Sequence, residues 1–272
     1  MGILRDDLQD IPSAAELHRL IGTCLDQDRF CLVVQPIVDL RTGCAYTGEA
    51  LSRLNHPELG SISADVFTPI LETMERHSEF DLYIFRKCCL WMQQAGNVGK
   101  RFDRLSCNFS RATLSQRGLA RELIRIADSY EIPHGKLGIE ITEWRPATDM
   151  QQITENLRQL KEARFRIILD DYGSGVTSEW DLCNFPLDIV KLDHSLLQNA
   201  GTKEGSTEFR TLVSKLTQLG LKVVCEGIET EAQDTIAREA GCHYGQGFLY
   251  CAPLSQDRVF ERIGKPFRSE AL

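Results

Sequence analysis

The chain has 272 residues, of which 42% are hydrophobic and 26% are charged, so it can bury a large core. Lysine and arginine total 31 against 39 aspartates and glutamates, which gives a formal net charge of −8. This acidity argues against binding a DNA or RNA polymer, or an anionic membrane, through a basic face. It still allows a small anionic ligand that is held through metal ions.

The sequence carries no signal for a membrane or for secretion. It contains no run of about 18 apolar residues, and its N-terminus has no apolar stretch of signal-peptide length. Ten cysteines form no CxxC pair, and Cys31, Cys107 and Cys225 lie in strand-like runs, where a thiol behaves as a small hydrophobe. We therefore expect a cytoplasmic domain with reduced thiols and no membrane contact of its own. Six scattered histidines include no HxH or HExxH pattern, which argues against a histidine zinc site.

Strand-like and helical segments alternate along most of the chain. The expected strands are Phe30–Leu40, Cys44–Leu51, Leu105–Ser110, Leu137–Thr142, Phe165–Asp170, Asp188–Asp193, Leu221–Glu226 and His243–Leu249. The expected helices are 13–27, 63–95, 115–130, 149–163, 178–184, 205–219, 231–240 and 254–263. This alternation predicts a parallel sheet, and eight strands in a chain of this length predict a closed (β/α)₈ barrel of the TIM type.

One connection departs from that pattern. Only Arg41, Thr42 and Gly43 separate the first two expected strands, whereas parallel neighbours need a dozen or more connecting residues. The first two strands should therefore form an antiparallel hairpin, so that the first strand of the barrel runs against the others.

Polar residues stand at the end of nearly every expected strand, where the catalytic residues of such barrels lie. They are Glu49 and Arg53, Asn108, Glu140 with Glu143, Asp170 with Asp171, Lys191, Glu226 with Glu229, and Gln246. Strand alternation places the larger apolar face of these strands on the helices, and Asn108, Glu140 and Asp170 on the opposite face. We therefore expect these polar groups to point toward the barrel axis.

A single polar strand end has an ordinary structural explanation, because loops begin there. Five carboxylates at one end of a barrel are harder to explain, since they crowd together with few local cations and would cost stability unless compensated. Divalent metal ions are the natural compensation, and oxygen ligands without histidine or cysteine favour Mg²⁺ or Mn²⁺. The acids supply enough oxygens for two ions that share a bridging carboxylate, which is an arrangement suited to phosphoester displacement.

At this point the sequence resembles a known family, the EAL-domain cyclic di-GMP phosphodiesterases. The shared motifs occur in order over residues of about 14 to 264. They are Gln35-Pro36-Ile37, Glu49-Ala50-Leu51, NFS at Asn108, EITE from Glu140 to Glu143, DDYGSG from Asp170 to Gly175, VKLD around Lys191, EGIET from Glu226 to Thr230, and GQGF around Gln246. On this basis residues 1–13 form an N-terminal lead-in, 14–264 the EAL domain and 265–272 a C-terminal tail.

The resemblance implies hydrolysis of cyclic di-GMP to linear pGpG, a barrel with a reversed first strand, and a homodimer. It also implies a set of metal ligands: Glu49, Asn108, Glu140 and Asp170 for one cation, with Asp170 bridging to a second cation that Asp171 and Glu226 also hold. Lys191 would position or polarise the attacking water, with Glu226 as an alternative base and Glu49 essential to the reaction. Arg53 would contact a phosphate, Gln35 and Gln246 would contact substrate, and Glu143 would anchor the glycine-rich loop.

Two departures from the family pattern leave every implied metal ligand in place. Residues Val176 to Glu179 stand where the family usually has Tyr-Ser-Ser-Leu, and the helix that follows the EAL motif lacks a common glycine. An active phosphodiesterase is therefore the first hypothesis. A weakly active or inactive receptor or interaction module for cyclic di-GMP is the alternative, and a metal barrel that acts on another phosphoester is a third.

Overall fold

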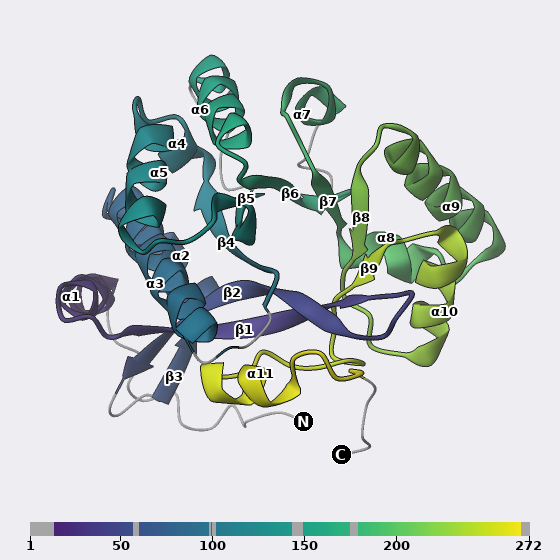
Figure 1. Cartoon of the computed structure of the whole chain (residues 1–272), viewed down its shortest axis with the longest axis horizontal. Helices are drawn as coiled ribbons and strands as arrows, with labels where there is room; N and C mark the ends of the chain where they lie inside the picture. Colours follow the sequence, from purple (N-terminus) through teal and green to yellow (C-terminus); the bar gives the residue numbers. More distant parts are fainter. Residues whose placement is uncertain are drawn as a thin grey trace.

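The computed structural model describes residues 14–56, 60–97, 99, 102–142, 149–174 and 179–267. Eight strands form a closed barrel (Figure 1): β1 (Phe30–Asp39), β2 (Ala45–His56), β4 (Arg104–Ser110), β5 (Leu137–Thr142), β6 (Arg166–Tyr172), β7 (Ile189–Leu192), β8 (Lys222–Cys225) and β9 (Tyr244–Gly245). Each strand pairs with its neighbours in the order β1-β9-β8-β7-β6-β5-β4-β2, and an additional pairing between β1 and β2 closes the ring. The predicted TIM-type barrel is confirmed.

The first strand runs against the rest, as the short connection predicted. β1 is antiparallel to both β2 and β9, whereas every pairing from β2 through β4 to β9 is parallel. In the tight turn between β1 and β2, the Asp39 carboxylate accepts hydrogen bonds from the backbone N–H groups of Arg41 and Thr42. Gly43 then adopts a φ of +73°, a conformation that glycine reaches without steric cost. The antiparallel register places Gln35 directly opposite Glu49.

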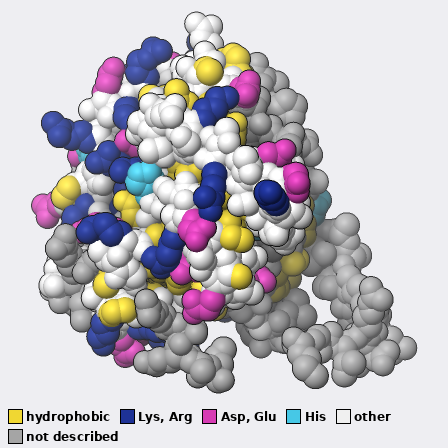
Figure 2. All heavy atoms as spheres, turned by 90° about the vertical axis from the view of Figure 1, so that its right-hand side faces the viewer, with side chains coloured by type: hydrophobic (Ala, Val, Ile, Leu, Met, Phe, Trp, Pro, Cys, Tyr) yellow, Lys and Arg dark blue, Asp and Glu magenta, His cyan; other side chains and the backbone are white. Residues whose placement is uncertain are grey.

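The helices cover the outside of the barrel (Figure 1). They are α1 (Ala14–Asp26), α2 (Ala64–Thr73), α3 (His77–Asn97), α4 (Arg111–Leu114), α5 (Leu119–Ser129), α6 (Met150–Glu162), α7 (Glu179–Asn184), α8 (His194–Asn199), α9 (Lys203–Gln218), α10 (Glu231–Ala240) and α11 (Gln256–Arg262), with a 3₁₀ turn at His134–Lys136. In the part of the chain that the structure describes, none of these helices combines the length and the apolar character needed to cross a membrane. On the face shown in Figure 2, basic and acidic side chains are intermingled rather than gathered in one basic surface.

Several expected elements differ in extent from those observed: the helix expected over 115–130 begins at Leu119, and the short helices α4 and α8 were not expected. The single helix expected over 63–95 is two helices, because Glu75 adopts a left-handed conformation with a φ of +55°. An additional strand, β3 (Gly60–Ser63), pairs with the end of β2, which runs past its expected end at Leu51. The strand expected over His243–Leu249 is wrong beyond Gly245. There the chain turns, and the Leu249 N–H donates to the carbonyl of Ile228 instead of to a neighbouring strand.

The barrel interior has an apolar layer beneath a charged one. Ile37, Ile168, Ile189 and Val224 form a small buried cluster of their own inside the ring. Two residues further along three of these strands, on the same face, stand Asp170, Lys191 and Glu226. The intervening residues Leu169, Val190 and Cys225 belong to the main core, which the strands share with the helices. Strand alternation therefore brings the charged groups together at the C-terminal end of the barrel, above an apolar floor.

The cysteines agree with the expected core role. All ten are free thiols, and seven of them are buried.

The segment that follows α11 packs on the hairpin between β1 and β2. The Phe267 N–H donates to the Gly43 carbonyl, and the Phe267 ring is buried.

Candidate metal centre

The Lys191 ammonium lies at the centre of the charged layer, and its side chain is 2% exposed. Its Nζ atom lies 2.9 Å from Glu49 Oε2, 2.9 Å from Glu140 Oε2, 2.9 Å from Asp170 Oδ1 and 2.8 Å from Glu226 Oε1. These carboxylates come from β2, β5 and β6 and from the residue that follows β8. The structure therefore brings together four of the five predicted acids around one lysine. Sequence reasoning had not anticipated this lysine as their shared countercharge.

Neutral side chains fix the orientation of two of these carboxylates. Asn108 Nδ2 donates to Glu49 Oε1 at 2.8 Å, and Gln246 Nε2 donates to Glu49 Oε2 at 2.8 Å. Gln246 Nε2 also lies 3.2 Å from the Gln35 side-chain oxygen. Ser106, which precedes Asn108 by two residues on the inward face of β4, donates to Glu140 Oε1. Glu49 and Glu140 are thus held in place before any ligand binds.

A bulge in β6 lets two consecutive aspartates face the same centre. In a regular strand, Asp170 and Asp171 would point to opposite faces. Here the register with β7 shifts between Leu169 and Tyr172, and Asp171 takes a φ of +50°. Asp is one of the residues that tolerate this left-handed conformation. The carboxylates of both aspartates therefore reach the end of the barrel, a result that strand alternation alone would not predict.

Two overlapping groups of carboxylates have the spacing of a metal site. One consists of Glu49, Glu140 and Asp170, and the other of Asp170, Asp171 and Glu226; within each group the ligand atoms lie within 4.8 Å of one another. Asn108 Oδ1 is buried without a hydrogen-bond partner among the described residues, while its Nδ2 is engaged with Glu49. An unpaired amide oxygen beside carboxylates matches the oxygen ligands that Mg²⁺ and Mn²⁺ prefer. These residues fit two hard divalent cations that share Asp170.

Burial and the crowding of like charges shift the pKa values of the carboxylates and of Lys191. Burial, reinforced by the neighbouring Glu49 charge, raises the pKa of Glu140 to about 8 against the attraction of Lys191. Burial likewise raises the pKa of Asp170 to about 6 and that of Glu226 well above its ordinary value. Glu49 behaves differently: burial would raise its pKa, but Lys191 and the hydrogen bonds from Gln246 and Asn108 hold it below the ordinary value. Burial opposes the charge of Lys191, yet the four carboxylates raise its pKa well above the usual range.

Two cavities flank the charged layer, and Asp171 lines both. The first, which we name the Gln246 cavity, has a volume of about 250 Å³ and is also lined by Gln35, Glu226 and Phe248. The second, the Asp81 cavity, has a volume of about 310 Å³. Its walls include the apolar side chains of Leu71, Phe80 and Ile84 and the polar side chains of His77, Asp81, Asn108 and Asp170. The centre is therefore open on two sides to spaces that combine apolar walls with polar groups.

Two predicted site residues are not placed at the centre by the structure: one points elsewhere, and the other is outside the described residues. Arg53 shares the Glu49 face of β2, but its guanidinium donates to the Ser52 carbonyl at 2.8 Å, and it is not among the residues that line either cavity. Its role as a phosphate contact stays a prediction. Glu143, predicted to anchor the glycine-rich loop, lies outside the described residues. So do Gly175 and the first three residues of the variant stretch that follows it.

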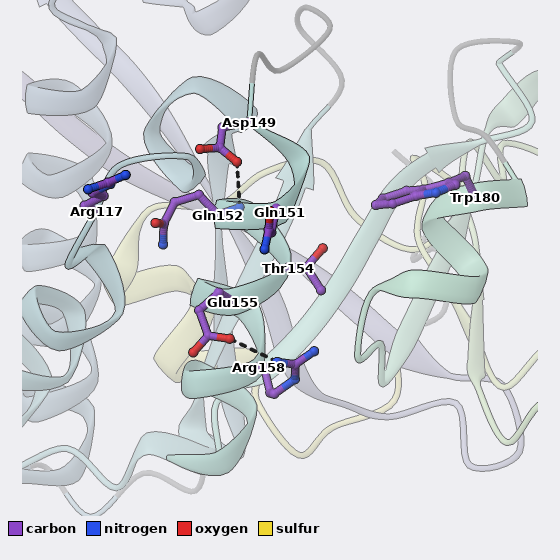
Figure 3. A pocket seen from close by; sticks show the side chains of 8 residues that line it. All are labelled: Arg117, Asp149, Gln151, Gln152, Thr154, Glu155, Arg158 and Trp180. Atoms are coloured by element: carbon purple, nitrogen blue, oxygen red, sulfur yellow. Dashed lines mark hydrogen bonds and ion pairs between the residues drawn. The ribbon is translucent and has the colours of Figure 1, made fainter.

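A third cavity lies over α6, away from the charged layer (Figure 3). Arg117 lines it on one side and Trp180 of α7 on the other, with α6 between them. Its volume is about 580 Å³, larger than that of either cavity at the centre. None of the predicted site residues lines it, so the largest of these three cavities is not the one beside the carboxylates.

Sequence reasoning missed several residues that line or support the centre. Ser106 was passed over, although its place two residues before Asn108 on the same strand face could have signalled it. Asp193 and His194 line the Gln246 cavity, and the Asp193 carboxylate caps α8 by accepting from the Ser195 N–H at 2.9 Å. Phe248 is 66% exposed at the same cavity. Phe248 belongs to the GQGF motif, but its exposure could not be predicted because it depends on the turn that ends β9.

Comparison with known proteins agrees with the family resemblance of the sequence motifs. The family model described as EAL domain matches residues 15–253. The chain is 31% identical over 246 residues to the Pseudomonas aeruginosa protein named cyclic di-GMP phosphodiesterase PA2567, covering 89% of this chain and 41% of that protein. It is 28% identical over 256 residues to cyclic di-GMP phosphodiesterase RocR of the same organism, covering 94% of this chain and 64% of that protein. Among solved structures it resembles the PaMucR phosphodiesterase in its c-di-GMP complex, with a TM-score of 0.82 and 26% identity, covering 89% of this chain and 99% of that one.

Proposed function

Because the chain belongs to the EAL domain family, which its match over residues 15–253 establishes, we propose that it hydrolyses cyclic di-GMP to linear pGpG. In this reaction a water oxygen forms a bond to one phosphorus, and the bond from that phosphorus to the 3′ oxygen breaks. The product carries a 5′-phosphate and a free 3′-hydroxyl. The observation that carries the proposal is the overlap of two carboxylate groups at Asp170, beside the unpaired oxygen of Asn108.

We further propose that Glu49, Asn108, Glu140 and Asp170 hold one divalent cation and that Asp170, Asp171 and Glu226 hold a second, with Mg²⁺ or Mn²⁺ as the metal. When bound, such cations lower the pKa of water and stabilise the charge that develops on the phosphate. The side chains of the protein would position the water and accept its proton. Lys191, held 2.8 Å from Glu226 Oε1, would position the attacking water, and Glu226 would accept its proton where it is not occupied as a ligand.

The substrate would lie across the centre, with one half in the Gln246 cavity and the other in the Asp81 cavity. Both cavities are lined by Asp171, so a dinucleotide that occupies them places a phosphate next to the carboxylates. Gln35 and Gln246 would contact the substrate from the first cavity. Arg53 would contact a phosphate after releasing the Ser52 carbonyl, and its fixed fork of donors suits that contact.

The test is turnover of cyclic di-GMP by the purified chain with Mg²⁺ or Mn²⁺, followed by chromatography of the nucleotides. Glu49→Ala should abolish formation of pGpG. Glu208→Ala, a matched change at an exposed position of α9, should leave it intact. Binding of cyclic di-GMP without metal and without linear product would favour the receptor alternative. Comparable turnover of unrelated phosphoesters would favour the third hypothesis.

The family resemblance also predicts a homodimer in the cytoplasm. The assembly can be tested separately from the chemistry, by sedimentation velocity of the purified chain over a range of concentrations. A single species with the mass of one chain at every concentration would contradict the dimer without affecting the proposed reaction.

A further inference from the structure

Lys191 is surrounded by more negative charge than it can balance. Four carboxylates lie within 2.9 Å of its ammonium, which has three hydrogen-bond donors. Hydrogen bonds run from Nζ to Glu49 Oε2 and Glu140 Oε2, each at 2.9 Å. Asp170 Oδ1, at the same distance, is an ion-pair contact without hydrogen-bond geometry. The site therefore contains one positive charge, whereas its carboxylates are arranged to bind two divalent cations.

The position of Lys191 leaves it no alternative partner in solvent. β7 is a buried strand, and the residue that precedes Lys191 on its inward face is Ile189 of the apolar floor. The side chain rises from that floor directly into the carboxylates, and 2% of it is exposed. A charge buried to this degree is stable in the fold only if opposite charges are held against it. The four carboxylates depend on Lys191 in the same way. Among the described residues, Lys191 is the cation that each of them pairs with.

The Lys191 contacts fall on both proposed cation sites. Glu49, Glu140 and Asp170 belong to the first group of ligand atoms, and Asp170 and Glu226 belong to the second. The carboxylates that contact the ammonium at 2.8–2.9 Å are the same groups that the divalent cations would bind. Like charges repel at such separations, so Lys191 and the cations compete for the shared oxygens.

We propose that Lys191 is a built-in countercharge that keeps the four carboxylates in place in protein stripped of divalent cations, and that it lowers the affinity of the site for those cations. This inference rests on the proposed function, because it takes metal ions as the ligands of the centre. Lys191 thereby allows the barrel to fold without metal, and the cations bind by taking over contacts that the ammonium already makes. In this respect it is a positioning residue that acts through the carboxylates, in addition to any contact with water.

The experiment compares the wild-type chain with Lys191→Met, which keeps the length of the side chain and removes its charge. Melting temperature is measured in EDTA and over a titration of Mn²⁺, and the affinity for Mn²⁺ is measured by calorimetry in the absence of nucleotide. Lys191→Met should melt lower than wild type in EDTA, gain more from Mn²⁺, and bind Mn²⁺ about ten-fold more tightly, within the usual range of coupling between two binding events. Lys222→Met, the same change at an exposed lysine of β8, should match wild type in every measurement.

Recovery of folded Lys191→Met only when Mn²⁺ is present would also support the inference. If the variant does not fold in either condition, the double variant Lys191→Met/Glu140→Gln decides the question. Removing one of the four buried carboxyl groups should restore part of the EDTA stability that Lys191→Met loses, and failure of the double variant to regain any would overturn the inference. Equal melting temperatures in EDTA with equal or weaker Mn²⁺ binding by Lys191→Met would overturn it as well. If wild type and variants all ignore Mn²⁺, the proposed metal chemistry fails, whereas their comparison in EDTA still reports on the countercharge.

Discussion

Two buried groups of charges in this barrel are built on opposite principles. At the centre, one ammonium faces four carboxylates, while α4 and α7 are joined by one guanidinium and one carboxylate. Arg111 and Asp181 form two parallel hydrogen bonds of 3.0 and 2.9 Å, with side chains 9% and 2% exposed. The guanidinium also lies over the Phe185 ring, 5.6 Å from its centroid.

The contrast separates charges that complete a fold from charges that prepare a site. The planar fork of Arg111 matches the carboxylate of Asp181 in both charge and geometry, so one positive charge is placed against one negative charge. The group around Lys191 is unbalanced, and its imbalance raises the pKa of Glu140 and Asp170 through burial and mutual repulsion. A buried excess of negative charge costs stability and is explained by the cations that the site is proposed to hold.

The largest effect should follow from replacing the carboxylate that both proposed cation sites share. Asp170→Asn should lower the turnover of cyclic di-GMP by about 10⁴-fold, the scale seen when one member of a catalytic unit is removed. Asp181→Asn, the same change in the balanced pair, should retain most of the activity per folded molecule. Steady-state rates normalised to the folded fraction by circular dichroism would check this. Similar losses in the two variants would remove the functional distinction between the groups.

The balanced pair should dominate stability rather than chemistry. Arg111→Met removes the buried ion pair with Asp181 and should lower the free energy of unfolding by about 3–5 kcal/mol. The double variant Arg111→Met/Asp181→Leu should recover much of this loss, because both charges of the ion pair are then removed. Urea denaturation in EDTA and in Mn²⁺ would measure both variants. The loss should be the same in the two conditions, and a loss that Mn²⁺ repairs would tie the pair to the centre.

The comparison also shows what sequence could and could not establish. Glu49, Asn108, Glu140 and Asp170 were assigned to one centre because strand ends and strand alternation are local properties of the chain. Asp171 reaches that centre through a bulge whose φ of +50° no alternation pattern reveals. The contacts of Lys191 join residues up to 142 positions apart, so they depend on closure of the barrel. The Arg111–Asp181 pair, 70 positions apart, escaped prediction for the same reason.

The pH dependence of the free energy of unfolding should reflect the crowded carboxylates at the centre. Glu140 and Asp170 have raised pKa values of about 8 and about 6, so between pH 4.5 and 8 the folded protein holds protons that the unfolded chain has released. By linkage, these groups make the free energy of unfolding in EDTA fall as the pH rises through that window. The raised pKa of Lys191 keeps its charge constant over this range, and the lowered pKa of Glu49 acts below it.

Urea denaturation at pH 5, 6, 7 and 8 would measure that slope in wild type and in Glu140→Gln. The variant should show a shallower fall, because Glu140 no longer titrates, while Asp170, Asp171 and Glu226, whose pKa values are also raised, remain. A wild-type free energy of unfolding that rises steadily from pH 5 to 8 in EDTA, with the same slope in Glu140→Gln, would show that the crowding at the centre does not control stability.

The smallest expected effect concerns the neutral groups that orient the carboxylates. Ser106 donates to Glu140 Oε1 from the same face of β4 as Asn108, and it is 1% exposed. Ser106→Ala removes this donor without changing the charge of the centre. It should weaken Mn²⁺ binding by about 10-fold, as is usual when a hydrogen bond that orients a metal ligand is lost. Ser115→Ala, at a half-buried serine just beyond α4 whose hydroxyl donates to the Ala112 carbonyl, is the matched control. Calorimetric titration with Mn²⁺ decides the matter: unchanged affinity in Ser106→Ala would mean that Glu140 is held by Lys191 alone. In that case the ion pairs with Lys191, and not the hydrogen bond from Ser106, would orient Glu140 for metal binding.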